Sequence, residues 1–187
     1  MNIIILGPQG SGKGTQAKLL AEKLNLKHIS IGELLRQAAR SLTPKGKIIK
    51  NLQTKGILIP FETTLELLEP VLKKTTQGFI LDGMPRDLRQ AEHLDWFLKQ
   101  IKQQINHVIF ITLSQKSTYN RLLKRAKLEG RSDDTKQAIK KRLEIYETKT
   151  VPVIKYFKDA GKLIEIDGEP DIATIHHSIL SKLNPRG

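Results

Sequence analysis

Short apolar runs alternate along the chain with longer segments in which apolar side chains recur every three or four positions. The short runs have the length of buried strands, and the longer segments have the period of amphipathic helices. Strands are predicted at residues 3–6, 27–30, 78–82, 107–113 and 162–167. Helices are predicted at 16–24, 32–40, 44–54, 87–101, 135–148 and 172–183. Three more are predicted with one end fixed: one begins at 60, one ends at 128, and one follows 148 and ends at 159. Because the strands alternate with helices, we expect an α/β fold with a five-stranded parallel sheet and helices on both faces.

The first predicted strand leads into a glycine-rich stretch, Gly-Pro-Gln-Gly-Ser-Gly-Lys-Gly-Thr, at residues 7–15. A strand, a glycine-rich turn with lysine and a helix are together typical of a phosphate-binding loop, whereas a plain turn needs neither four glycines nor a lysine. The N–H groups of such a loop converge on an anion, and the helix N-terminus adds partial positive charge. The general pattern has Ser or Thr directly after the lysine, but a glycine intervenes here. The expected phosphate contacts are Gly10, Ser11, Gly12, Lys13, Gly14 and Thr15.

A carboxylate and an arginine follow the third predicted strand. Asp82 ends the apolar run at 79–81, and Arg86 emerges from the Gly-Met-Pro turn that follows. Mg²⁺ prefers oxygen ligands and keeps most of its waters, so one carboxylate can serve it through water. A guanidinium group held by a rigid turn can fork onto phosphate oxygens. Taken alone, Asp82 would be a turn cap and Arg86 a surface side chain. Beside a phosphate loop, we interpret them as a Mg²⁺ site and a phosphate contact.

The composition limits the class of protein without choosing its function. The 187 residues suit one domain, and the formal net charge of +13 favours anionic partners, either nucleotides or nucleic acid. Aromatic residues make up 5% of the chain, too few for a base-stacking surface, so we expect no nucleic-acid partner. Cysteine is absent, which excludes disulfides and thiolate metal sites. No apolar run has the length of a membrane span and no signal peptide is visible, so we expect no membrane partner and a cytoplasmic location.

Several motifs together resemble the nucleoside monophosphate kinases, and among them the adenylate kinases, over essentially the whole chain. Residues 7–16 are similar to the family's phosphate loop, including its Gly-Lys-Gly-Thr ending, which accounts for the intervening glycine. Residues 82–86, Asp-Gly-Met-Pro-Arg, are similar to the family's Asp-Gly-Phe-Pro-Arg, and 28–36 resemble the segment that enters the monophosphate site. The resemblance implies a P-loop nucleoside triphosphate hydrolase-like fold. It also implies reversible phosphoryl transfer from ATP to AMP, giving two ADP, with Mg²⁺ as the cofactor of ATP.

The resemblance also implies roles for individual residues. It assigns Lys13, Arg86, Arg125, Arg131 and Arg142 to catalysis. It assigns ATP to the phosphate loop together with Arg121, Arg125 and Pro170, and the Mg²⁺, through water, to Asp82. It assigns AMP to Ile31, Arg36, Ile57, Leu58, Ile59, Gly83, Met84, Pro85, Arg86, Gln90, Arg131 and Arg142. Gln90 stands where adenylate kinases carry the glutamine that reads adenine, and its amide offers both a donor and an acceptor.

Two residues depart from the family pattern. Ile31 stands where adenylate kinases usually carry threonine, and Glu33 where they usually carry aspartate. Ile31 leaves a pyrimidine or broad-specificity nucleoside monophosphate kinase as an alternative. The positive charge leaves a nucleic-acid-associated phosphate-loop ATPase as a less favoured one, and the intact site residues argue against an inactive scaffold.

The resemblance extends to the organisation of the chain. We expect a single core domain, residues 1–187, with two mobile inserts. One is a monophosphate-binding region at 30–59, and the other is a short lid at 126–132. The short lid has no room for an inserted hairpin, and without cysteine we expect no zinc. We also expect a monomer whose small-molecule partners are ATP, AMP and ADP.

Overall fold

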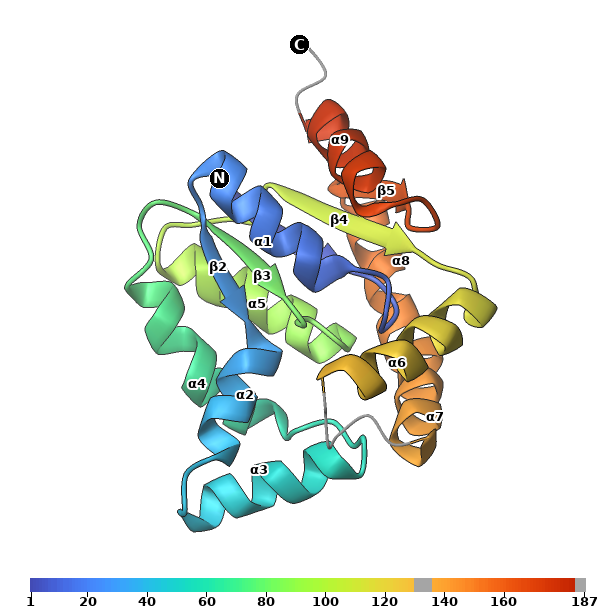
Figure 1. Cartoon of the computed structure of the whole chain (residues 1–187). Coiled ribbons are helices and arrows are strands. Elements are labelled where there is room, and N and C mark those ends of the chain that lie inside the picture. The colour runs from blue at the N-terminus through green and yellow to red at the C-terminus, as the bar shows by residue number, and fades with distance from the viewer. Residues whose placement is uncertain (130–135, 184–187) are drawn as a thin grey trace.

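Five parallel strands form the sheet that the sequence predicts (Figure 1). The computed structural model describes residues 1–129 and 136–183, without the side chains of 125–129 and 136. The strands are β1 (Asn2–Leu6), β2 (Lys27–Ser30), β3 (Phe79–Asp82), β4 (His107–Thr112) and β5 (Leu163–Asp167). They lie in the order β2-β3-β1-β4-β5, and every neighbouring pair is parallel. The chain crosses from the β2–β3 side of β1 to the β4–β5 side, so the loop after β1 lies at a topological switch point.

Helices cover both faces of this sheet, as expected (Figure 1). Helices α1 (Lys13–Leu24) and α9 (Ile172–Leu183) pack on one face, and α4 (Phe61–Lys73), α5 (Leu88–Gln100) and α8 (Val151–Asp159) pack on the other. Alternate side chains of β1 enter opposite cores: Ile3 and Ile5 pack with α1, whereas Ile4 and Leu6 pack with the other helices. All four are at most 3% exposed. The strand that carries the phosphate loop is therefore held from both faces.

The remaining helices gather at the carboxyl edge of the sheet (Figure 1). Helices α2 (Ile31–Ala39) and α3 (Pro44–Thr54) occupy the region 30–59, and α6 (Gln115–Glu129) and α7 (Lys136–Ile145) follow β4. Residues 126–129 of the predicted lid end α6, and 130–132 lie outside the described residues. No helix in the described ranges is long and apolar enough to cross a membrane.

Two helices differ by more than one residue from the boundaries that the sequence predicts. Helix α1 begins at Lys13 rather than at 16, because Gly12 takes the left-handed conformation, φ 84°, and acts as its N-cap. The helix predicted at 135–148 ends at Ile145 and continues through a π-helical turn, η1 (Tyr146–Thr150), directly into α8. Pro152 causes no break because it lies in the first turn of α8, where its missing N–H is not needed.

Candidate active site

A cavity of about 980 Å³ lies at the carboxyl edge of the sheet, beside the loop after β1. This volume is at the upper end of the ~300–1,000 Å³ typical of small-molecule sites. The predicted site residues that line it are Gly10, Gly12, Lys13, Gly14, Thr15, Ile31, Arg36, Ile57, Leu58, Ile59, Asp82, Gly83, Arg86, Gln90, Arg121 and Arg142. The fold therefore brings together the phosphate loop, the region 30–59, the turn after β3, and helices α6 and α7.

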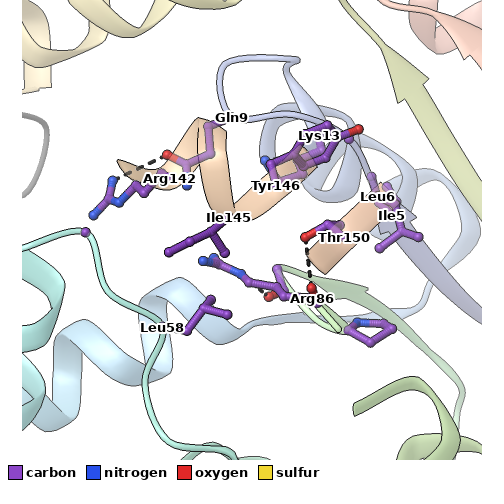
Figure 2. Close-up of a pocket in the computed structure, with 14 residues that line it drawn as sticks. Ile5, Leu6, Gln9, Lys13, Leu58, Arg86, Arg142, Ile145, Tyr146 and Thr150 are labelled. Atoms are coloured by element: carbon purple, nitrogen blue, oxygen red, sulfur yellow. Dashed lines mark hydrogen bonds between the residues drawn. The ribbon is translucent and has the colours of Figure 1, made fainter. Parts of the chain in front are cut away.

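A few predicted site residues do not line this cavity. They are Ser11, Met84, Pro85 and Pro170. Ser11 and Met84 are fully buried, and Pro85 lines a smaller, adjoining cavity of about 50 Å³, shown in Figure 2. The side chain of Arg125 and the whole of Arg131 lie outside the described residues, so their roles stay predictions.

Backbone geometry shapes the phosphate loop. Gly7 has a φ of 151°, and a Cβ built on it would lie 2.6 Å from the Ile111 carbonyl oxygen, so the loop passes β4 too closely for a side chain. The Nζ atom of Lys13 donates to the Pro8 carbonyl oxygen at 3.3 Å. The Ser11 Oγ atom is buried and makes no hydrogen bond with any described residue. Together with the N-terminus of α1, this arrangement favours an anion in the loop.

Asp82 ends β3 and lies against the phosphate loop. It is in register with Ile5 of β1, and a Cβ built on Gly14 would lie 3.3 Å from its Oδ2 atom. A Cβ at this position would press against the carboxylate, which favours a glycine directly after the lysine of the loop. The Oδ1 atom of Asp82 is buried and makes no hydrogen bond with any described residue, which is costly unless a ligand contacts it. Because carboxylate oxygens suit Mg²⁺, the residues here fit a magnesium ion between Asp82 and the loop.

His28 lies on β2, next to the strand that carries Asp82. Its Nε2 atom is buried and has no hydrogen-bond partner among the described residues. Burial lowers the pKa of His28, while the carboxylates of Asp82 and Glu33 oppose this change. The cavity wall nearest β2 thus presents a neutral imidazole close to two carboxylates at neutral pH.

Three hydrogen bonds hold Arg86 in the turn after β3. Its backbone N–H donates to Gln90 Oε1 at 2.8 Å, and its Nε donates to the Gly83 carbonyl oxygen at 2.9 Å. Its own carbonyl oxygen accepts a hydrogen bond from Thr150 Oγ1 at 2.9 Å (Figure 2). Backbone and side chain are therefore both restrained, which fixes the direction of the guanidinium group.

Arg142 of α7 lies near Arg86 and lines both cavities with it (Figure 2). Its Nη1 donates to Gln9 Oε1 at 3.4 Å, and its Nη2 donates to the Gln53 carbonyl oxygen at 3.3 Å. It thereby joins α7 to the phosphate loop and to the end of α3. Burial lowers the pKa of Arg86, Arg142 lowers it further, and Asp82 opposes both. Arginine stays charged at neutral pH, so the two guanidinium groups make a positive site for phosphate oxygens.

Gln90 lies in the first turn of α5 in a fixed orientation. It is 5% exposed, and its backbone N–H donates to Asp87 Oδ1, the N-cap of α5, at 2.9 Å. The side-chain oxygen already accepts the N–H of Arg86, but a carbonyl oxygen has a second lone pair and the amide nitrogen has two donors. Ile31 and residues 57–59 add apolar surface to the same cavity. This combination suits a planar base with hydrogen-bonding edges.

Arg121 of α6 is attached to the turn after β5. Its Nη2 donates to the Glu169 carbonyl oxygen at 3.1 Å. The Glu169 carboxylate accepts hydrogen bonds from the Ser114 N–H at 2.9 Å and from Ser117 Oγ at 2.7 Å. These bonds lower the pKa of Glu169 to about 2, so the carboxylate stays ionised beside the N-terminus of α6. The turn that contains Pro170 is thus joined to the helix that carries Arg121.

Some lining residues are not singled out by the sequence. Lys124 lies three positions after Arg121 and lines the cavity with it, a spacing that does predict a shared helix face. Gln9 lies in the loop, but its contact with Arg142 joins residues 133 positions apart and leaves no local signal. The hydrogen bond from Thr150 to the turn after β3 spans 64 positions and likewise leaves no local signal.

The sheet order, the phosphate loop at the switch point and the arginines around one cavity define a P-loop kinase α/β fold. The family model described as "Adenylate kinase" matches residues 5–162. The chain belongs to the adenylate kinase family.

The sequences of individual relatives align with this chain over most of their length. The chain is 40% identical to the adenylate kinase of Prochlorococcus marinus (strain MIT 9211), covering 97% of this chain and 96% of that protein. It is 38% identical to the adenylate kinase of Stenotrophomonas maltophilia (strain K279a), with 98% and 99% covered. It is 39% identical to the adenylate kinase of Thermus thermophilus, with 89% and 88% covered. The similarity thus includes the sheet, the cavity and the helices around it.

Proposed function

We propose that this protein transfers a phosphoryl group reversibly from ATP to AMP, giving two ADP, and so balances the adenine nucleotides. The observation that carries the proposal is the meeting of the phosphate loop, Asp82, Arg36, Arg86 and Arg142 around one cavity in a member of the adenylate kinase family. Phosphoryl transfer needs positioning and positive charge around the transferred group more than covalent chemistry. The cavity supplies both, so the chemistry of the site and the family agree.

The phosphate loop is the binding site for the phosphates of ATP in this proposal. Its N–H groups and the N-terminus of α1 face an anion, with contacts from Gly10, Ser11, Gly12, Gly14 and Thr15. The ammonium group of Lys13, which donates to a loop carbonyl oxygen in the structure, neutralises the outer phosphates. In this proposal the rest of the donor nucleotide extends toward Arg121, which lines the cavity and donates to the Glu169 carbonyl oxygen, next to Pro170.

The acceptor AMP occupies the side of the cavity formed by α2, the turn after β3 and the start of α5. Arg36 and Arg86 hold its phosphate, and Gln90 reads the adenine edge. The apolar residues assigned to this side are Ile31, Ile57, Leu58, Ile59, Met84 and Pro85, with Gly83 at the turn. Met84 and Pro85 do not line the large cavity. Met84 is buried and Pro85 lines the small cavity, and both support the turn that carries Arg86.

The transfer step uses positive charge and in-line geometry. Lys13, Arg86 and Arg142 surround the place where the donor and acceptor phosphates meet, and Arg125 and Arg131 belong to the same set. We assign no general base, because a phosphate oxygen of AMP is already a nucleophile. Asp82, through water, and Thr15 would hold the magnesium ion of the nucleotide, and the ion would supply positive charge to the phosphates. The protein's own residues orient both phosphates and exclude water.

Exclusion of water is needed because water is a competing acceptor. The end of the region 30–59 contacts α7 closely: a Cβ on Gly56 would lie 2.7 Å from the Ala138 carbonyl oxygen. Arg142 reinforces this contact through its hydrogen bond to Gln53. We infer that the regions 30–59 and 126–132 close over the nucleotides and open for product release.

A direct assay tests the proposal. Purified protein is incubated with ATP, Mg²⁺ and, separately, AMP, CMP, UMP or GMP, and the diphosphates formed are quantified. We expect ADP formation with AMP at the highest kcat/KM. A higher kcat/KM with CMP or UMP would instead identify a pyrimidine or broad-specificity enzyme. ATP hydrolysis without any diphosphate product from the acceptor, combined with salt-dependent nucleic-acid binding, would contradict the proposal.

The remaining expectations concern the protein in solution. The monomeric state stays a prediction, which sedimentation velocity at the assay concentration checks. The cytoplasmic location also stays a prediction, which fractionation of the source cells checks.

A further inference from the structure

A π-helical turn lies between α7 and α8, in the wall of the small cavity that adjoins the candidate active site. In this turn the Val151 N–H donates to the carbonyl oxygen of Tyr146, five residues earlier instead of four. Turns of this kind are rare and are frequently found at functional sites. This turn lies between Arg142 on α7 and the whole of α8. It therefore sets the rotation of α7 relative to α8 about the helix axis.

The π turn determines which side of the helix Thr150 occupies. In an α-helix each residue turns by about 100°, so residues 142, 146 and 150 would drift around the axis by about 40° per step. A π turn contains more residues per revolution, which rotates Thr150 back toward the side of Arg142 and Tyr146. All three line the small cavity (Figure 2), and Thr150 is only 7% exposed.

Thr150 donates its hydroxyl hydrogen to a residue of the site rather than to its own helix. Its Oγ1 atom lies 2.9 Å from the Arg86 carbonyl oxygen. Threonine hydroxyls inside helices commonly bond to the carbonyl oxygen four residues earlier. Thr148, in the same π turn, does this with Glu144 at 2.8 Å. The two threonines therefore form a natural pair for comparison.

The hydrogen bond from Thr150 joins Arg86 to a distant part of the chain. The other two hydrogen-bond partners of Arg86 are Gly83 and Gln90, which lie within four positions of it and move with its own turn. Among the described residues, Thr150 alone hydrogen-bonds Arg86 from outside this turn. Since the guanidinium groups of Arg86 and Arg142 repel each other, their separation has to be held by the surrounding structure.

We propose that Thr150 is a positioning residue for phosphoryl transfer. Its hydroxyl, presented by the π turn, holds Arg86 at a fixed separation from Arg142, so that both guanidinium groups meet the phosphates together. The proposal rests on the proposed function in one respect, that these arginines hold nucleotide phosphates. Thr150 itself does not touch the substrates.

Three variants isolate the hydroxyl of Thr150. Thr150→Val removes it while keeping the branched shape, Thr150→Ser keeps it while losing the methyl group, and Thr148→Val is the matched control in the same turn. In Thr150→Val, kcat/KM for AMP should fall by about tenfold to a hundredfold, because small displacements of a positioning group have effects of this size. KM for ATP should stay within roughly twofold, Thr150→Ser should recover most of the loss, and Thr148→Val should match the wild type.

A second measurement reports the position of the Arg86 side chain and does not depend on enzyme activity. The Nε–Hε signal of Arg86 is observed in ¹⁵N-arginine-labelled protein and is assigned as the signal lost in Arg86→Lys. In Thr150→Val this signal should shift and exchange faster with solvent, and in Thr150→Ser and Thr148→Val it should match the wild type. An unchanged signal in folded Thr150→Val would overturn the proposal, whatever the kinetics. If the wild type forms no ADP from ATP and AMP, the proposed function fails, and this signal still decides whether Thr150 holds Arg86.

Discussion

The two sides of the candidate site are built in different ways. On one side, the phosphate loop consists of residues 7–15, and its shape comes from glycines that allow a close approach to β4 and β3. On the other side, the arginines come from α2, the turn after β3, α6 and α7. Arg142 is held by residues 89 and 133 positions away, and Arg121 by a residue 48 positions away. The loop is therefore a property of a short segment, whereas the arginine cluster is a property of the whole fold.

Because the two sides are built differently, substitutions should affect their structure in different ways. The loop depends on backbone conformation, so it should be sensitive to an added Cβ and less so to the loss of a distant contact. The arginine cluster depends on long-range hydrogen bonds, so a change far from the cavity should displace it. Substitutions on each side, and in the segments that join them, separate these two kinds of dependence.

The largest effect is expected where the loop supplies a full charge. Lys13→Ala should lower kcat by about a thousandfold, because a preorganised donor to the transferred group is removed. The control is Lys23→Ala, an exposed lysine in the last turn of the same helix, which should keep wild-type kinetics. Steady-state assays with ATP and AMP measure both. A kcat for Lys13→Ala within about tenfold of the wild type would remove this lysine from the transfer step.

On the arginine side, Arg86→Ala should lower kcat/KM for AMP by about a hundredfold, because phosphate binding loses a forked donor. Arg89→Ala is the matched control, since Arg89 lies on the outside of α5 and pairs with Glu62 at 2.9 Å. The same kinetic assay distinguishes the two. Equal activity of the two variants would mean that the turn after β3 does not hold the acceptor.

A pair of glycines tests the backbone dependence of the loop. Gly7→Ala places a Cβ against the Ile111 carbonyl oxygen, and Gly12→Ala places one in open space at a φ of 84°. Gly7→Ala should lower the free energy of unfolding by about 3 kcal/mol or more, from strain and overlap together. Gly12→Ala should lower it by about 1–2 kcal/mol, from the left-handed conformation alone. Urea unfolding of both variants measures the difference, and equal losses would contradict the tight passage of the loop beside β4.

Gln90 has two roles in the proposed site: its amide reads the base, and its Oε1 atom accepts the Arg86 N–H. Two variants separate these contributions. Gln90→Glu keeps an oxygen that can accept the Arg86 N–H but loses the amide donor, whereas Gln90→Ala loses both. Gln90→Glu should raise KM for AMP by roughly tenfold with little change in kcat, the size of one lost hydrogen bond. Gln90→Ala should show the same change and a lower kcat. The selectivity for AMP over CMP should fall in both; an unchanged ratio would exclude Gln90 from base reading.

The smallest effect is expected at the turn after β5 and concerns acid stability. The pKa of Glu169 is lowered from 4.5 to about 2 in the folded protein. Its contribution to stability is therefore fully present above about pH 4.5 and is lost as the pH falls toward about 2. Glu169→Gln should be less stable than the wild type at neutral pH, and the difference in urea unfolding should shrink as the pH falls from about 5 to about 3. Glu165→Gln, an exposed change on β5, serves as the control and should show no such trend.

Much of the fold could be predicted from local patterns. Thr43 and Pro44 mark the start of α3, and the Thr43 hydroxyl indeed accepts the Gly46 N–H at 3.1 Å. All five predicted strands are strands of the sheet, and β1 and β3, whose side chains are buried on both faces, are continuous apolar runs. The π turn could not be predicted, since no residue type marks a helix interior for five-residue hydrogen bonding.

The sequence alone determined the phosphate loop, the class of fold and the family resemblance, because glycines, lysine and apolar runs act through neighbours along the chain. The tertiary structure alone decided three further features. These are the approach of Gly14 to Asp82, the proximity of Arg86 to Arg142, and the hydrogen bond from Thr150 to the Arg86 carbonyl oxygen. The physical reason is that backbone preferences are set by adjacent residues, whereas contacts between distant side chains exist only once the sheet and its helices have packed.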